Sequence, residues 1–171
     1  MKQLFTLIFF FGIHTLNAQS KGYTDLQKIH EDFVKILKSK DWEEINLFVK
    51  NITPDEATLA YMKANKISHG SMTEPQAEFP FLIQMNRLVF LNAICLVRYK
   101  REEFGGELRE ITFIKLKNQR TEVIKMGAVS MEVAETEALL KYGNEEVTIK
   151  LSEFGKINGV WKAFSSPRIN L

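Results

Sequence analysis

Residues 147–164 read VTIKLSEFGKINGVWKAF, and an Asn-Gly pair at positions 158 and 159 divides this stretch in two. Both central residues of a type I′ turn need positive φ, which asparagine and glycine adopt more readily than other residues. The flanking runs, 147–157 and 160–164, have the alternating apolar pattern of strands. The stretch therefore predicts a tight β-hairpin, with Trp161 and Phe164 in or near the core.

Further alternating runs precede this hairpin and predict an antiparallel sheet. A polar break at 118–120 suits a turn, and Gly127 suits a bulge inside a strand. The expected strands cover residues 108–117, 121–133 and 138–142. Together with the hairpin they form a meander of four or five strands.

The N-terminal half has the periodicity of helices instead. Helices are expected over residues 24–39, from 42 to about 49, from 54 to about 64 or 66, and 81–99. Thr53 is the expected N-cap of the third helix, with Pro54 at its first position. The fold class predicted is α+β, in which N-terminal helices pack on one face of a curved antiparallel four- to five-stranded meander.

The segment 81–99 is almost continuously apolar and longer than a typical strand. A helix there is expected to bury one stripe, formed by Leu82, Met85, Val89, Ala93 and Leu96. Polar residues inside the segment make a membrane span unfavourable.

Those polar residues are also candidates for a binding site. Convergent polar groups among apolar side chains are typical of a small-ligand pocket. The expected ligand-binding residues are Asn86, Arg87, Asn92 and Tyr99. In the alternative interpretation, Arg87 and Arg98 extend to solvent and Asn92 bonds locally.

The element order from residue 24 to 166, and above all the closing strand INGVWKAF at 157–164, resembles the nuclear transport factor two-like superfamily of cone-shaped α+β domains. The resemblance implies a pocket that hosts either binding proteins or small isomerases, dehydratases or hydrolases. Function is not implied by the fold alone.

The first 18 residues have the features of a cleavable signal peptide. Lys2 precedes an apolar run from Leu4 to Leu16, and Ala18 is the small residue expected before the cut. An uncleaved anchor is the alternative, but the run is shorter than the roughly 20 residues that a spanning helix needs. We therefore expect an exported protein, periplasmic or secreted, whose residues 19–171 form a single α+β domain with no membrane span.

The charge balance bears on the expected partners, and the cysteine content bears on disulfide bonds. The sequence has 23 basic and 21 acidic residues, so loss of Lys2 leaves 22 against 21, and nucleic acid is not an expected partner. The single cysteine, Cys95, permits no internal disulfide and is expected to be a small buried hydrophobe.

No metal, cofactor or nucleophile motif is evident. His30 is followed by Glu31 but lacks the second histidine at position 34 that a zinc helix needs. His30 is expected to face solvent, because it follows the apolar Ile29 and consecutive helix residues do not share a face. His69 lies beside Gly70-Ser71 in a turn-rich stretch, without the flanking glycines of a nucleophile elbow. Neither a cofactor nor a metal is therefore expected.

Three roles remain open on these grounds. The first is a non-enzymatic exported domain that binds a small apolar ligand or an envelope protein. The second is a small pocket enzyme whose acid and base come from positions such as Asp25, His69 or Glu78. The third is a structural role at the cell surface, through addition of a strand to a partner.

Overall fold

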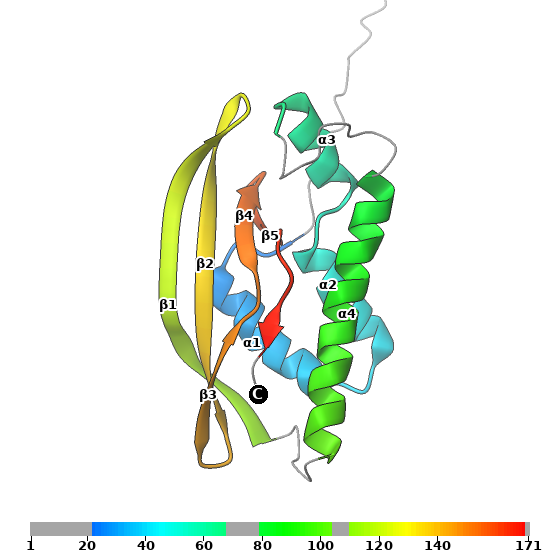
Figure 1. Ribbon diagram of the computed structural model, residues 1–171, viewed down its shortest axis with the longest axis vertical. Helices are drawn as coiled ribbons and strands as arrows, with labels where there is room; N and C mark the ends of the chain where they lie inside the picture. Colours follow the sequence, from blue (N-terminus) through cyan, green and yellow to red (C-terminus); the bar gives the residue numbers. More distant parts are fainter. Residues whose placement is uncertain (1–21, 68–78, 104–109, 170–171) are drawn as a thin grey trace, which may run out of the picture.

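The computed structural model describes residues 22–67, 79–103 and 110–169. The expected signal peptide, His69 and Glu78 lie outside these residues. In the described part, helices pack against a curved antiparallel sheet, so the predicted α+β class is confirmed (Figure 1). The elements are α1 (Leu26–Lys38), α2 (Trp42–Ile52), α3 (Glu56–Ala64), α4 (Phe79–Glu103), β1 (Ile111–Met126), β2 (Val129–Tyr142), β3 (Glu145–Lys150), β4 (Glu153–Ile157), β5 (Val160–Ala163) and β6 (Arg168–Ile169).

Aspartate caps begin the first three helices. The N-cap residues of α1, α2 and α3 are Asp25, Asp41 and Asp55, and each carboxylate accepts a hydrogen bond from a backbone N–H of the first turn. The prediction of Thr53 as the cap of α3 is wrong. Thr53 ends α2 instead, and its hydroxyl donates to the Val49 carbonyl at 2.7 Å.

Helix α4 forms where the sequence predicts it, but another stripe is buried. The residues that face the core are Ile83, Phe90, Ile94 and Val97, whereas Met85 and Leu96 of the predicted stripe are exposed. Cys95 is also exposed, which corrects its predicted burial. Because α4 is apolar around most of its circumference, periodicity alone does not identify its inner face. No helix among the described residues has the length and hydropathy that crossing a membrane requires.

One long hairpin dominates the sheet. β1 pairs with β2 from Ile111↔Tyr142 to Met126↔Val129. The predicted turn at 118–120 is wrong: β1 continues through these residues, with two register irregularities between positions 113 and 118. Gly127 is not a bulge in a strand but lies in the turn between β1 and β2, with φ of 60°.

The rest of the sheet lies along the other edge of β2. β3 and β4 both pair antiparallel with β2, so the predicted strand 147–157 is interrupted at residues 151 and 152. From Ala138↔Ile149 to Glu135↔Glu153, β2 advances three residues while its partner advances four, and this extra residue is a bulge. β5 then pairs with β4 and β6 with β3. The described sheet therefore has six strands instead of the four or five predicted, and it is not a simple meander, because β2 pairs with β1, β3 and β4.

The predicted Asn-Gly hairpin is confirmed. Asn158 and Gly159 both have positive φ, 50° and 81°, and Ile157 pairs with Val160 across the turn. Trp161 is buried and Phe164 is half-buried, as the sequence predicts.

The prediction that His30 faces solvent is wrong. His30 is fully buried between α1 and β2, because α1 buries a stripe wide enough to include both Ile29 and His30. Its Nδ1 lies 2.9 Å from the Leu26 carbonyl, which can only accept, so Nδ1 carries the proton. Nε2 then accepts from the Thr136 hydroxyl at 3.1 Å. Burial lowers the pKa of His30, and the bond to Leu26 offsets this only in part.

We expect acid to weaken the fold through His30. The unfolded chain takes up a proton at this residue near pH 6.5, while the folded chain does not, so the free energy of unfolding falls as the pH drops from about 6.5 toward the lowered pKa. Urea unfolding at several pH values between 7.5 and 5 measures this slope. His30→Gln, which cannot titrate, is the control, and parallel pH profiles for the two proteins would contradict the assignment.

Candidate functional site

A cavity of about 240 Å³ lies between β4, the end of α3 and the part of the β1–β2 hairpin near its turn. Its walls are mainly aliphatic and thioether side chains, with two phenylalanines, Phe154 and Phe164, and charged groups among the rest. The lining residues are Met62, Ile67, Arg120, Glu122, Ile124, Met126, Met131, Val133, Ala134, Glu135, Glu153, Phe154, Gly155, Ile157 and Phe164.

Strand alternation explains how the sheet builds these walls. Side chains two residues apart share a face, so Ile124 and Met126 of β1 point to the same side. Ile124 pairs with Met131, and Val133 of β2 pairs with Gly155 of β4, which continues this apolar face across three strands.

Gly155 leaves room inside this face. A Cβ at this position would lie 2.8 Å from the Phe164 ring and 3.1 Å from the Met131 methyl group. Any larger residue here therefore displaces side chains that line the cavity.

The end of α3 and the segment after it close the cavity on the side away from the sheet. Met62 and Ile67 form a small buried cluster with Met131 and Ile157. A hydrogen bond connects the β1–β2 turn to the end of α3: the backbone N–H of Ala128 donates to the Asn65 carbonyl at 2.8 Å.

Charged residues form one row along the cavity. Arg120, Glu135 and Glu153 are register partners across β1, β2 and β4, and Glu122 follows on β1. Arg120 pairs with Glu122 at 3.2 Å, and Lys150 pairs with Glu135 at the same distance. The lining therefore contains three carboxylates and one guanidinium, which favours a ligand with a hydrogen-bond donor or a cationic group at this end.

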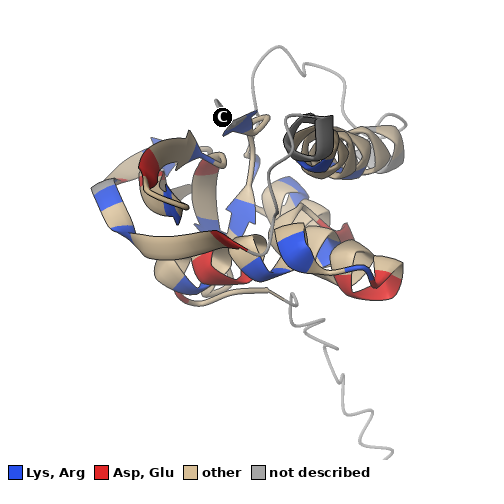
Figure 2. Ribbon diagram, turned by 90° about the horizontal axis from the view of Figure 1, so that it is seen from below, with Lys and Arg blue, Asp and Glu red and all other residues tan. Residues whose placement is uncertain are grey.

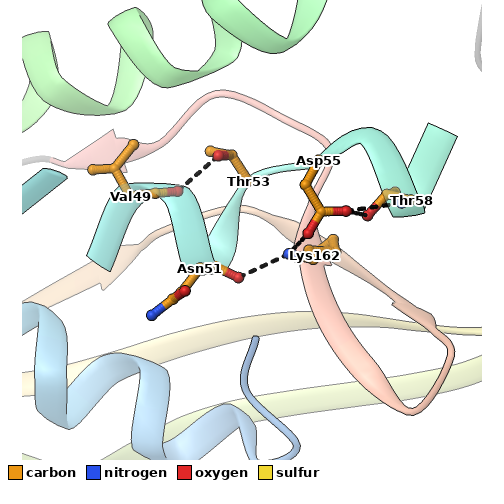
Figure 3. A network of polar contacts seen from close by, with 6 residues as sticks. All are labelled: Val49, Asn51, Thr53, Asp55, Thr58 and Lys162. Atoms are coloured by element: carbon orange, nitrogen blue, oxygen red, sulfur yellow. Dashed lines mark hydrogen bonds and ion pairs between the residues drawn. The ribbon is translucent and has the colours of Figure 1, made fainter. Parts of the chain in front are cut away.

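A buried ion pair lies on the neighbouring strand. Lys162 of β5 has no exposed surface, and its ammonium donates to the Asp55 carboxylate at 3.0 Å and to the Asn51 carbonyl at 3.1 Å (Figure 3). The other oxygen of Asp55 accepts from the hydroxyl and the backbone N–H of Thr58, at 2.7 and 2.8 Å. This network joins the end of α2, the start of α3 and β5.

The two partners of this pair have pKa values below their ordinary ranges. Burial lowers the pKa of Lys162, while the hydrogen bond and charge of Asp55 act in the opposite direction. Burial raises the pKa of Asp55, but the hydrogen bonds from Thr58 and Lys162 outweigh it and the result is a lowered value. The 3.0 Å contact between the ammonium and the carboxylate opposes the effect of burial on both groups.

The ligand-binding residues predicted from the sequence all lie on α4, and none lines the cavity. Asn86 and Arg87 are half-buried, whereas Asn92 and Tyr99 are exposed. Arg98 lies 5.9 Å from the centre of the Trp42 ring. The ligand-binding role of these residues stays a prediction.

Of the candidate catalytic positions, only Asp25 lies among the described residues, where it caps α1. The histidine of the described part, His30, is enclosed between Leu26 and Thr136. No group of three potential metal ligands occurs within residues 22–67, 79–103 and 110–169.

Sequence reasoning missed the cavity and Lys162. The methionines at 62, 126 and 131 lie far apart along the chain, so no local pattern connects them. Lys162 carried no local signal either, because the burial of β5 on both faces depends on the elements that pack against it.

Comparisons with protein-family models, with curated proteins and with solved structures found no match.

Proposed function

We propose that this chain is an exported domain of the cone-shaped, nuclear transport factor two-like kind that binds a small, mainly apolar molecule. The observation that carries the proposal is the cavity between the β1–β2 hairpin, β4 and α3. Its lining combines a continuous apolar face with a few charged groups at one end, which is the usual composition of a small-ligand site. The predicted signal peptide and the α+β fold support the export and the superfamily assignment.

The chemistry of the walls favours a binder with broad tolerance for shape. Three methionines, Met62, Met126 and Met131, line the cavity. Their unbranched, polarisable side chains adapt to different apolar surfaces. The carboxylates of Glu122, Glu135 and Glu153 favour an amine or hydroxyl on the ligand over an acid.

Two measurements test the binding. Native mass spectrometry of the chain from Gln19, purified gently, should show excess mass that disappears on denaturation. The neutral fluorophore N-phenyl-1-naphthylamine should bind saturably, with an increase in emission as it enters the apolar cavity.

We expect Ile124→Trp to weaken binding of this fluorophore by about tenfold or more, because the larger side chain occupies the cavity. The matched control is Val123→Trp, which adds the same ring on the opposite face of β1, where Val123 is 70% exposed. Equal binding by both variants and the unmodified chain, or no binding and no retained mass at all, would refute the proposal.

A further inference from the structure

Helix α4 presents a second apolar face, opposite the one that packs on the core. Its large apolar side chains there are each 42–63% exposed, although soluble helices usually place charged groups on the outer face. They are Phe81, Met85, Leu88, Leu96 and Tyr99. The charged residues of the protein are otherwise interspersed over the helices and the sheet (Figure 2).

The spacing on this face is that of a coiled-coil seam. Residues 81, 85, 88, 92, 95 and 99 follow one another at intervals of four, three, four, three and four. Such a repeat of 3.5 residues keeps one stripe directed at a partner helix. The buried residues Ile83, Phe90, Ile94 and Val97 lie on the opposite side, so both faces can be occupied at once.

We propose that a second copy of this chain packs on this seam, with the two α4 helices parallel. The seam has no Asp, Glu, Lys or Arg, so it offers nothing to a charged partner. It is self-complementary, as a two-fold interface requires. Its four large apolar side chains are each 42–63% exposed in the protomer, so pairing with a second copy would remove apolar surface from water. They are Phe81, Met85, Leu88 and Tyr99.

The position of Asn92 in the seam favours a parallel arrangement of the two helices. In the heptad, Met85, Asn92 and Tyr99 occupy a positions, while Phe81, Leu88 and Cys95 occupy d positions. Parallel helices place like positions together, so Asn92 bonds to the Asn92 of its copy, a pairing that specifies two strands in register. Antiparallel helices would place Asn92 against Leu88 and leave its amide without a partner.

Sedimentation equilibrium of residues 19–171 tests the association, and we expect a dimer. Leu88→Glu should weaken dimerisation by more than about 30-fold, because it places two carboxylates at the centre of the seam. Leu88 is exposed within the protomer, so the circular dichroism spectrum of the folded variant should stay unchanged. Val123→Glu, the same kind of substitution at an exposed apolar residue of β1, should leave the dimer intact.

A short bis-maleimide tests the orientation, because parallel helices place the two Cys95 thiols opposite each other, within about 7 Å between Cα atoms. We expect efficient crosslinking of the dimer and none with Cys95→Ser. A chain that remains monomeric at about 100 μM, or a dimer unaffected by Leu88→Glu, would overturn the interface. A dimer that the reagent fails to join would overturn the parallel arrangement. Ligand binding in the cavity is independent of each of these outcomes.

Discussion

Asp55→Asn is expected to lower the free energy of unfolding by about 3–5 kcal/mol, because it leaves the Lys162 ammonium buried without its carboxylate. Lys162 has no exposed surface and its Nζ lies 3.0 Å from Asp55. Asparagine retains an oxygen that can accept from the N–H of Thr58, so the α3 cap is preserved. The decrease in the free energy of unfolding then measures the loss of the negative charge of Asp55. Urea unfolding monitored by circular dichroism measures the change.

Lys162→Met is the informative companion. It removes the buried charge and keeps most of the side-chain volume, so we expect a cost well below that of Asp55→Asn. In the double variant the two losses should not add, since the second substitution removes the charge that the first one stranded. Additive losses would show that Asp55 and Lys162 act independently, contrary to the contact in Figure 3.

Gly127→Ala is expected to be the most damaging glycine substitution in the described sheet. Gly127 has φ of 60°, and an added Cβ would overlap the carbonyl oxygens of both Asn65 and Lys66. These are backbone atoms and cannot rotate away as a side chain can. We expect a loss of about 3 kcal/mol or more, the sum of left-handed strain of about 1–2 kcal/mol and the separation of the hairpin from the segment after α3.

Two other glycines separate these contributions. Gly143 and Gly159 also have positive φ, but a Cβ at Gly143 meets only one side-chain oxygen at 3.9 Å and one at Gly159 meets nothing within 4 Å. Alanine at either position should cost only the strain of about 1–2 kcal/mol. Equal losses at all three positions would mean that the contact between the hairpin turn and residues 65–66 contributes no stability.

Gly127→Ala should also weaken binding of N-phenyl-1-naphthylamine. Met126 lies next to the turn and Ile67 next to the contacted segment, and both line the cavity. A stable variant with unchanged binding would show that the cavity does not depend on this contact.

Local sequence patterns predicted the elements that depend on local physics. The Asn158-Gly159 turn needs only two residues that tolerate positive φ, and it forms as predicted. The helical type of α4 and the α+β order were likewise predicted, although α4 extends beyond the predicted residues 81–99, from Phe79 to Glu103. Prediction failed at 118–120, because polar residues in an exposed hairpin resemble a turn although β1 continues through them.

The candidate site was only partly accessible from the sequence. The polar residues of α4 interrupt an apolar run and were easy to find, but the cavity lies elsewhere and is built from three strands and the end of α3. Its lining depends on register, such as Val133 opposite Gly155, and register is a property of paired strands.

By itself, then, the sequence determined the secondary structure of most elements, the tight C-terminal turn and the class of fold, since these follow from propensity, capping and periodicity within a few residues. Tertiary structure decided which face of α4 is inner, that His30 and Lys162 are buried while Cys95 is exposed, and where the cavity lies. The physical reason is that burial is a relation between distant segments: Asp55 reaches Lys162 across more than a hundred residues, and no local pattern records such a contact.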